Sequence, residues 1–250
     1  MSSLSDRLRL DCQKDMIPNV IGGHLISVFA GMFIASAAMS APEGEVVNGT
    51  LPSGLEKRYM LFVPPQAKEG RKLPLIVALH GAGGKPDGPI KWWQAIATER
   101  GYFVLAPKSN GGTWPGGGDQ SHVARMVAAM ERERPIDPKR VLLTGVSDGG
   151  TWTYALGFQN PKLFAALAPI SGVLMRTLVG SLPMQPKLPI CVVHGTDDKI
   201  FIVARAQAAV KALKSAHFNV NYIEVAQGHH GWFPEKAAEI LDWFEKPQSP

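Results

Sequence analysis

The sequence predicts an α/β domain built on a mostly parallel, doubly wound β-sheet. From Arg58 onward, short apolar segments of strand length alternate with segments of helical periodicity, the pattern of parallel strands joined by crossover helices. The 250 residues are enough for one such domain with a large buried core. A hydrophobic content of 45% with a charged content of 19% excludes a disordered chain.

Charge and cysteine content narrow the class of ligands. The net charge is +5, but the lysines and arginines are scattered without a basic block, which argues against nucleic-acid binding. The two cysteines, Cys12 and Cys191, show no metal-ligand spacing, and Cys191 lies in an apolar run that predicts a buried thiol. The sequence therefore predicts neither a metal nor a cofactor.

The first forty residues differ in composition from the rest. Leu25–Ala41 is a run of apolar and small residues, and Ala35-Ser36-Ala37 within it fits a small-x-small cleavage site. We expect residues 1–37 to be a secretory signal peptide and 38–250 to be one mature domain, secreted or periplasmic and without a stable membrane partner. The alternative is an uncleaved membrane anchor, since the longer segment Val20–Ala41 could nearly span a bilayer.

Apolar runs, helical spacing and turn residues predict the elements in chain order. Strands are expected at Arg58–Val63, Leu73–Leu79, Tyr102–Ala106, Val141–Leu143, Phe164–Ile170, Leu188–Val193 and Val220–Val225. Helices are expected at Ile90–Arg100, Asp119–Arg132, Thr151–Leu156, Val203–Ser215 and Pro234–Phe244. The interval Gly172–Lys187 should be a short loop, too short for a helical cap domain.

A Gly-x-Ser-x-Gly sequence follows the predicted strand Val141–Leu143. Gly145-Val146-Ser147-Asp148-Gly149 then leads directly into a predicted helix, and strand, Gly-x-Ser-x-Gly, helix is the arrangement of a nucleophile elbow. The glycines avoid a steric collision in the tight turn, which raises the serine hydroxyl above the sheet edge. A chance Gly-rich turn in a chain with 26 glycines is the alternative. We interpret Ser147 as a nucleophile.

The partners of such a serine are found by elimination, because the acid and then the base follow it in the chain. Asp197 and Asp198 come after the strand Leu188–Val193, at the carboxyl end where open α/β sheets build their sites. Ordinary turn chemistry is the alternative explanation of this aspartate pair. His229 and His230 follow the strand Val220–Val225, and either could serve as the base.

A Gly-rich loop is expected to complete the site. Leu79-His80-Gly81-Ala82-Gly83-Gly84 ends the predicted strand Leu73–Leu79, where the backbone N–H of Ala82 can form one half of an oxyanion hole. The N–H of Asp148, directly after the serine, would form the other half. Phosphate binding is excluded because no Gly-Lys-Ser/Thr follows the loop. Trp114 and Trp232 are placed to wall a substrate pocket, although simple packing would also explain them.

In these motifs the chain resembles the secreted α/β-hydrolase esterases related to polyhydroxybutyrate depolymerases, feruloyl esterases and the phospholipase/carboxylesterase group. The matching pieces are Leu79-His80-Gly81, Gly145 to Gly150, His194-Gly195-Thr196-Asp197-Asp198 and His230-Gly231-Trp232. The resemblance covers roughly Arg58 to Phe244 and implies an α/β-hydrolase fold without a large cap domain. It also implies Asp198 as the acid and His230 as the base, although His229 stands where the family often has glycine.

The resemblance implies a serine esterase that hydrolyses carboxylic esters, of short-chain acyl or aryl type, through an acyl-enzyme. The expected partner is a small-molecule or polymeric ester. The alternatives are a thioesterase, amidase or peptidase that uses the same triad, or a polyhydroxyalkanoate depolymerase. A binding protein on an inactive scaffold is disfavoured because all three triad residues are present.

Overall fold

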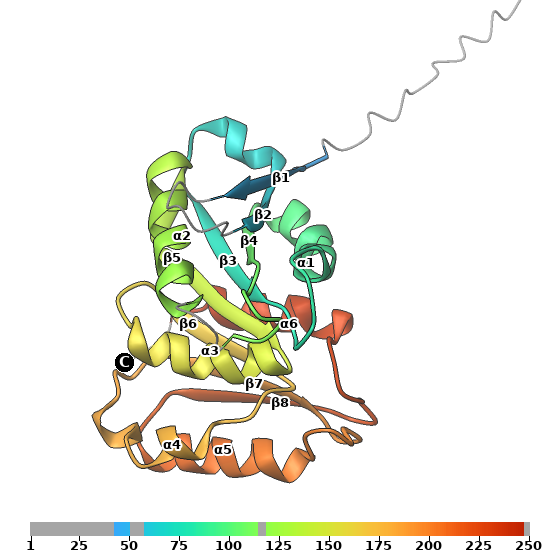
Figure 1. The fold of residues 1–250 in the computed structure, drawn as a ribbon, viewed down its shortest axis with the longest axis vertical. Helices are drawn as coiled ribbons and strands as arrows, with labels where there is room; N and C mark the ends of the chain where they lie inside the picture. Colours follow the sequence, from blue (N-terminus) through green and yellow to red (C-terminus); the bar gives the residue numbers. More distant parts are fainter. Residues whose placement is uncertain (1–42, 51–57, 115–118, 248–250) are drawn as a thin grey trace, which may run out of the picture. The chain divides into compact units, whose positions relative to one another are not determined.

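The strands form one sheet in the order β1-β2-β4-β3-β5-β6-β7-β8 (Figure 1). The computed structural model describes residues 43–50, 58–114 and 119–247. β1 and β2 pair antiparallel, as do β2 and β4, and every other neighbouring pair is parallel. The strands of this described part are β1 Glu45–Thr50, β2 Arg58–Val63, β3 Leu73–Leu79, β4 Phe103–Pro107, β5 Ile136–Val146, β6 Ala166–Ile170, β7 Ile190–Gly195 and β8 Val220–Val225.

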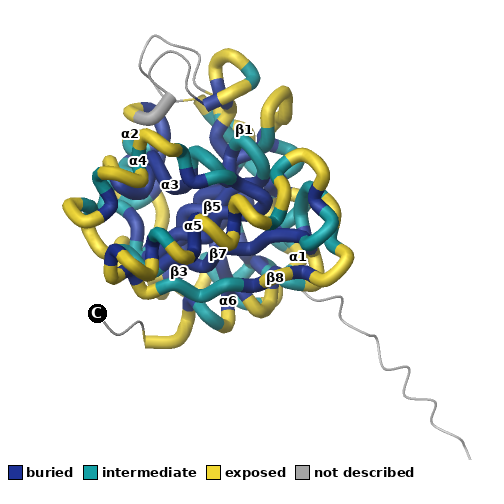
Figure 2. Tube along the Cα trace, turned by 90° about the horizontal axis from the view of Figure 1, so that it is seen from below, coloured by how far each residue is buried: buried dark blue, intermediate teal, exposed yellow. Residues whose placement is uncertain are grey.

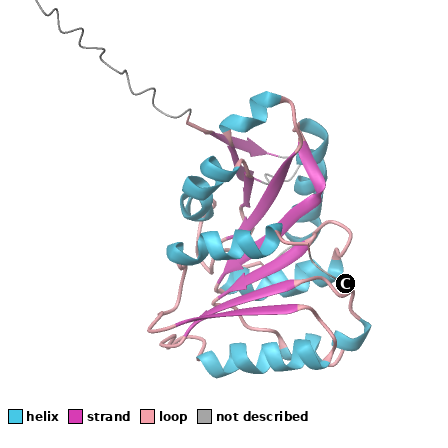
Figure 3. Cartoon of the chain, turned by 180° about the vertical axis from the view of Figure 1, so that it is seen from behind, coloured by secondary structure: helices cyan, strands magenta, loops and turns pink. Residues whose placement is uncertain are grey.

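Helices connect the parallel strands and cover both faces of the sheet (Figure 3). The α-helices are α1 Asp87–Arg100, α2 Asp119–Glu133, α3 Asp148–Gln159, α4 Arg176–Val179, α5 Val203–Ser215 and α6 Ala237–Glu245. Three short 3-10 turns accompany them: η1 Pro65–Glu69, η2 Leu182–Met184 and η3 Pro234–Lys236. This alternation confirms the predicted doubly wound, mostly parallel sheet.

Two hydrophobic cores lie on opposite faces of the sheet, because side chains alternate along each strand. On β3, Leu75 and Val77 pack in the core beneath α2, α3 and α5, whereas Ile76 and Ala78 pack beneath α1 and α6. The central strands are accordingly buried along most of their length (Figure 2). Such a continuous apolar strand is rigid, so the loops at its carboxyl end are held in fixed positions.

Several predicted elements are observed with the expected bounds, among them β2, β3, β8 and α5. β5 instead begins at Ile136, because Ile136 pairs with Leu73 before a shift in register. The helix predicted over Pro234–Phe244 opens as the 3-10 turn η3 and becomes α-helical at Ala237.

Two segments differ from the sequence-based expectation. The prediction missed β1, which has few apolar side chains and forms by antiparallel pairing with β2. The interval Gly172–Lys187 was expected to be a plain loop, but it contains the one-turn helix α4 and the turn η2. Neither element builds a cap domain, so among the described residues no helical domain lies above the sheet edge that carries Ser147.

The expected signal peptide over residues 1–37 lies outside the described residues and stays a prediction. Within the described ranges no helix is both long and apolar enough to cross a membrane. Cys191 is buried in β7, and this burial raises the pKa of its thiol to about 12. Its sulfur accepts a hydrogen bond from Asn221 Nδ2 at 3.4 Å, so the cysteine acts as a packed core residue.

Candidate active site

Ser147 occupies a strained turn between β5 and α3. Its backbone has φ 60° and ψ −114°, a conformation that a residue with a side chain rarely adopts. A Cβ on Gly145 would lie 2.5 Å from the carbonyl carbon of Gly149, and one on Gly149 would lie 2.5 Å from the carbonyl oxygen of Leu79. Larger residues at these two positions would force the turn open, as the motif predicts. The turn is also anchored to the sheet, since the Ser147 N–H donates to the Ile170 carbonyl at 3.0 Å.

Ser147, His230 and Asp198 lie in one hydrogen-bonded row. His230 Nε2 is 2.7 Å from Ser147 Oγ, and His230 Nδ1 is 2.8 Å from Asp198 Oδ2. With its proton on Nδ1, the imidazole donates to the carboxylate and leaves Nε2 free to accept the serine proton. The Asp198 side chain is fully buried, whereas the His230 side chain is 16% exposed. The row therefore begins in the core and opens to the surface at the serine.

The Asp198 carboxylate is held by more than His230. Its Oδ1 accepts the backbone N–H groups of Ile200 and Phe201, both at 2.8 Å. Burial by itself would raise the pKa of Asp198, but the hydrogen bonds from His230, Phe201 and Ile200 outweigh burial and hold that pKa below its ordinary value. Asp198 is thus kept ionised beside the imidazole.

His194, which the sequence analysis gave no role, makes a further contact to this carboxylate. Its Nε2 lies 3.1 Å from Asp198 Oδ2 and 2.6 Å from the Phe201 carbonyl oxygen. The ring is completely buried, and its Nδ1 has no hydrogen-bond partner within the described ranges. Because both neighbours of Nε2 are oxygen atoms that accept hydrogen bonds, Nε2 is the ring nitrogen that donates. The His-Gly-x-x-Asp spacing was the signal that could have identified this contact, because it places His194 at the end of β7 and Asp198 in the adjoining turn.

Asp197 and His229 point elsewhere. The Asp197 carboxylate accepts a hydrogen bond from Thr196 Oγ1 at 3.3 Å. His229 is exposed, and its Nδ1 approaches only the backbone oxygen of Asp197, at 3.5 Å. The sequence left one pair of aspartates and one pair of histidines as candidates. The structure brings Asp198 of the first pair and His230 of the second to Ser147.

The two predicted oxyanion donors, the N–H groups of Ala82 and Asp148, belong to segments that adjoin Ser147. Gly81 packs against the serine, since a Cβ on Gly81 would lie 3.5 Å from Ser147 Cβ. Asp148 is the first residue of α3, where backbone N–H groups have no partner inside the helix. Within the described residues, neither the Ala82 N–H nor the Asp148 N–H donates a hydrogen bond. Both are available to a negatively charged oxygen.

A surface pocket of about 420 Å³ extends from this loop. It is lined by residues 80–85 and 87–89 with Trp92 and Val146. Trp232, expected to wall a pocket, packs against Trp92 and Trp93 with ring centroids 6.0 and 4.8 Å apart. Trp92 is thus the tryptophan that lines the pocket, and Trp232 packs against it without lining the pocket itself.

Trp114, the second tryptophan expected on a pocket wall, is only 1% exposed. Its indole Nε1 donates to the His80 carbonyl at 2.8 Å, and its backbone N–H donates to Asp148 Oδ2 at 3.2 Å. An indole this deeply buried offers no surface to a substrate. Trp114 instead connects His80, in the loop after β3, to Asp148 at the beginning of α3.

The Asp148 side chain is the acidic group next to the serine. Burial raises the pKa of Asp148 above its ordinary value. This effect is opposed by hydrogen bonds from the Trp114 N–H and the Trp152 side chain and by the charge of His80, but burial outweighs them. Its carboxylate thus has a structural contact to the backbone of Trp114. No group of three or more His, Cys, Asp or Glu side chains suited to a metal ion occurs in the described ranges.

The fold and the site define an α/β-hydrolase of the serine type, with a parallel sheet, a strained serine after β5 and a histidine after β8. Residues 121–246, half of the chain, match the family model described as Phospholipase/Carboxylesterase, and the chain belongs to this family.

Individual relatives agree with this membership. A bifunctional acetylxylan esterase/xylanase of Neocallimastix patriciarum is 33% identical over 144 residues, which cover 55% of this chain and 21% of that protein. A probable feruloyl esterase C of Aspergillus terreus is 26% identical over 195 residues, covering 72% of this chain and 70% of the relative. A solved thermostable esterase is 28% identical with a TM-score of 0.67, covering 81% of this chain and 62% of the other. The chain thus spans 21% to 70% of the length of these three proteins.

Proposed function

We propose that this protein is a serine esterase that hydrolyses carboxylic esters through an acyl-enzyme. The observation that carries the proposal is the row Ser147–His230–Asp198, with its two hydrogen bonds of 2.7 and 2.8 Å. The family membership and the esterases among its relatives support the same reaction class.

In the first half-reaction, Ser147 Oγ attacks the ester carbonyl carbon while His230 Nε2 takes the serine proton. Asp198 stabilises the imidazolium that forms, and the N–H groups of Ala82 and Asp148 bind the oxyanion. The carbon–oxygen bond to the alcohol then breaks, and His230 gives its proton to the leaving oxygen. Ser147 is left as an acyl ester.

The second half-reaction repeats these steps with water. His230 removes a proton from a water molecule, whose oxygen attacks the acyl carbon of the ester on Ser147. When the tetrahedral intermediate collapses, the carboxylic acid leaves and Ser147 regains its proton from His230. The substrate is a small-molecule or polymeric ester, and the relatives' acetylxylan and feruloyl activities make short-chain acyl and aryl esters the first to try.

A fluorophosphonate probe tests the nucleophile directly, because it phosphonylates activated serines only. We expect wild-type protein to be labelled stoichiometrically and Ser147→Ala to remain unlabelled, with 4-nitrophenyl acetate hydrolysis lowered by about 10⁴- to 10⁶-fold. Ser109→Ala is the matched control, since Ser109 is a buried serine outside the row. Labelling of Ser147→Ala at the wild-type rate would overturn the proposal.

We also propose that residues 1–37 are an export signal and that the mature domain comprises 38–250. The apolar run and the small-x-small sequence at Ala35–Ala37 support the proposal. Intact mass spectrometry of protein exported by a bacterial host should give a chain that begins at or near Ala38. A full-length, membrane-bound product would support the anchor instead.

A further inference from the structure

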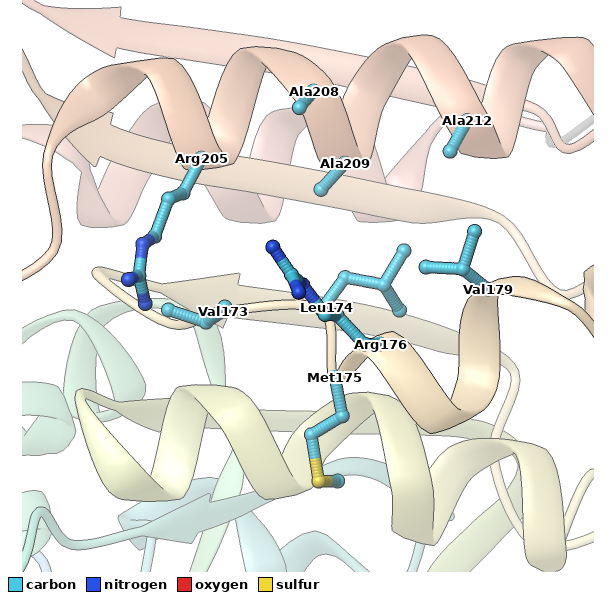
Figure 4. A pocket seen from close by; sticks show the side chains of 9 residues that line it. All are labelled: Val173, Leu174, Met175, Arg176, Val179, Arg205, Ala208, Ala209 and Ala212. Carbon is cyan, nitrogen blue, oxygen red and sulfur yellow. The ribbon is translucent and has the colours of Figure 1, made fainter.

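A cavity of about 530 Å³ lies between α5 and the segment that follows β6 (Figure 4). This volume is within the range of small-molecule sites. None of Ser147, Asp198 and His230 lines it. The lining residues belong to residues 173–179 on one side and to α5 on the other: Val173, Leu174, Met175, Arg176, Val179, Arg205, Ala208, Ala209 and Ala212.

Two arginines, and no acidic residue, line this cavity. Arg176 reaches it from α4 and Arg205 from the first turn of α5, and both guanidinium groups lie in the space between the two segments (Figure 4). Neither side chain forms an ion pair or a hydrogen bond with any residue the structure describes. Guanidinium groups keep their charge at all working pH values and match the geometry of carboxylates, so the pair favours an anionic group.

The other lining side chains are apolar and mostly small. On α5 the cavity is lined by small side chains, those of Ala208, Ala209 and Ala212, which leave space for it. The opposite wall is formed by Val173, Leu174 and Val179. A free inorganic anion would leave these apolar surfaces in contact with water. A ligand with an apolar body and one anionic end would cover the walls and also reach the arginines.

One wall of the cavity is connected by hydrogen bonds to the turn that carries Ser147. Thr151 Oγ1 donates to the Ser147 carbonyl oxygen at 3.1 Å and accepts the Val173 N–H at 3.0 Å, so one side chain bridges the serine turn and the cavity wall. On the opposite side, the ring of Phe201 lies 5.3 Å from the His230 ring, and α5 begins two residues later. The serine turn and the His230 ring are thus each in contact with a segment that leads to the cavity.

We propose that this cavity binds a second, free carboxylate on the ester substrate through Arg176 and Arg205. The preferred substrates would be monoesters of dicarboxylic acids or esters of carboxylate-bearing alcohols, in contrast to neutral esters of the same size. This inference rests on the proposed esterase function, which it refines by naming the substrate class.

Two matched ester pairs test the proposal and locate the carboxylate relative to the scissile bond. The first pair is 4-nitrophenyl hemiglutarate and its methyl ester, with the carboxylate on the acyl side. The second pair is 3-carboxyphenyl butyrate and its methyl ester, with the carboxylate on the alcohol side. We expect the wild type to favour the charged member of at least one pair by tenfold or more in kcat/KM, and Arg176→Gln/Arg205→Gln to lower that ratio at least tenfold.

The control variant Lys211→Gln/Lys214→Gln removes two positive charges from α5 outside the cavity lining. It should keep the wild-type ratio, which separates local binding from the attraction of the whole positively charged surface. Comparing ratios within a pair cancels any general loss of active enzyme. An unchanged ratio in the arginine variant, or an equal fall in the lysine variant, would overturn the proposal.

A direct measurement of binding shows whether a negative result contradicts the carboxylate site or the proposed esterase function. If the wild type hydrolyses none of the four esters, the proposed function fails, and titration calorimetry of monomethyl glutarate into Ser147→Ala still tests the cavity. We expect binding that is lost when Arg176→Gln and Arg205→Gln are added. Absence of binding, or equally tight binding of inorganic phosphate, would show that the cavity does not select a carboxylate on an apolar body.

Discussion

Ser171 and Gly231 exchange two hydrogen bonds across the candidate site. Ser171 Oγ donates to the Gly231 carbonyl at 3.0 Å and accepts the Gly231 N–H at 3.3 Å. Ser171 directly follows β6, is completely buried and has a positive φ of 46°, while Gly231 directly follows His230. This contact fixes the loop of the proposed base to the strand that neighbours the nucleophile.

Ser171→Ala should therefore lower kcat by about tenfold to a hundredfold and leave KM nearly unchanged, because a displaced imidazole slows proton transfer more than binding. The loss of two hydrogen bonds should also lower stability by about 1–3 kcal/mol. Steady-state kinetics and thermal unfolding measure both effects. The control Ser181→Ala also removes two hydrogen bonds, because Ser181 Oγ donates to the Leu178 carbonyl and accepts from Gln185 Nε2, away from the His230 loop. An equal loss of kcat in both variants would contradict a positioning role.

The two aspartates after β7 should differ sharply in their effect on turnover. Asp198→Asn removes the negative charge that faces His230 and should reduce kcat by about 10³- to 10⁴-fold. Asp197→Asn, whose side chain contacts Thr196, should stay within about threefold of the wild type. Both purified variants are compared with a short-chain 4-nitrophenyl ester. If Asp197→Asn were the inactive one, the assignment of the acid would be wrong by one position.

The two histidines after β8 give a parallel comparison. His230→Ala should reduce kcat by about 10⁴-fold or more, since Ser147 would lose its proton acceptor. His229→Ala should retain at least about a tenth of the activity, because that ring is exposed and contacts only a backbone oxygen. If His229→Ala were instead the variant with the greater loss of activity, His229 would be the base.

Asp148 should make stability depend on pH. Because burial raises its pKa in the folded state, the folded protein binds this proton more tightly than the unfolded chain does. The resulting stabilisation is complete below the ordinary pKa of about 3.9 and is lost as the pH rises through the raised value. In Asp148→Asn the side-chain oxygen can still accept the Trp114 N–H. We expect the Tm of this variant to exceed that of the wild type by more at pH 7.5 than at pH 4.

Asp87→Asn is the control for this pH experiment, because its carboxylate is exposed and pairs with Lys91 on the surface. The two variants each remove one negative charge. A Tm difference for Asp148→Asn that does not change with pH would show that burial does not perturb this carboxyl group.

Neutral esters should be cleaved more slowly as the acyl chain lengthens. The interval Gly172–Lys187 contributes only α4 and η2, which are too short to close over a long apolar chain. The cavity that its residues 173–179 line also contains the guanidinium groups of Arg176 and Arg205, so a palmitoyl group placed there would desolvate two charges without offering them a partner. We expect kcat/KM to fall from acetyl or butyryl to palmitoyl 4-nitrophenyl esters, without activation above the solubility limit. Rates that rise with chain length would mean that α4 moves to form a lid.

Local patterns predicted the sheet and the position of Ser147, whereas the residues alone left two aspartates and two histidines open, and the resemblance to a family selected Asp198 and His230. Continuous apolar runs marked β3 and β7, and the glycines around Ser147 marked a turn that tolerates no Cβ. β1 was missed because its pairing with β2, and not its own composition, makes it a strand.

The roles of buried polar side chains were harder to predict. His194 and Ser171 act through contacts that form only when β6, β7 and the His230 loop meet in the folded protein. Trp114 illustrates the same limit. Its place after β4 indicated nearness to the site, but only the fold determines that the indole turns inward toward His80.

The buried thiol of Cys191 has a practical consequence for labelling experiments. Residues 41–250 contain no other cysteine. Burial keeps alkylating reagents away from the Cys191 thiol, and because burial also raises its pKa to about 12, the thiol stays almost wholly protonated. A cysteine introduced at Ile200, which is 66% exposed and two residues from Asp198, would then be the reactive thiol of that part of the chain. A fluorophore attached there would report on the loop that holds the Asp198 carboxylate, without any need to remove the native cysteine.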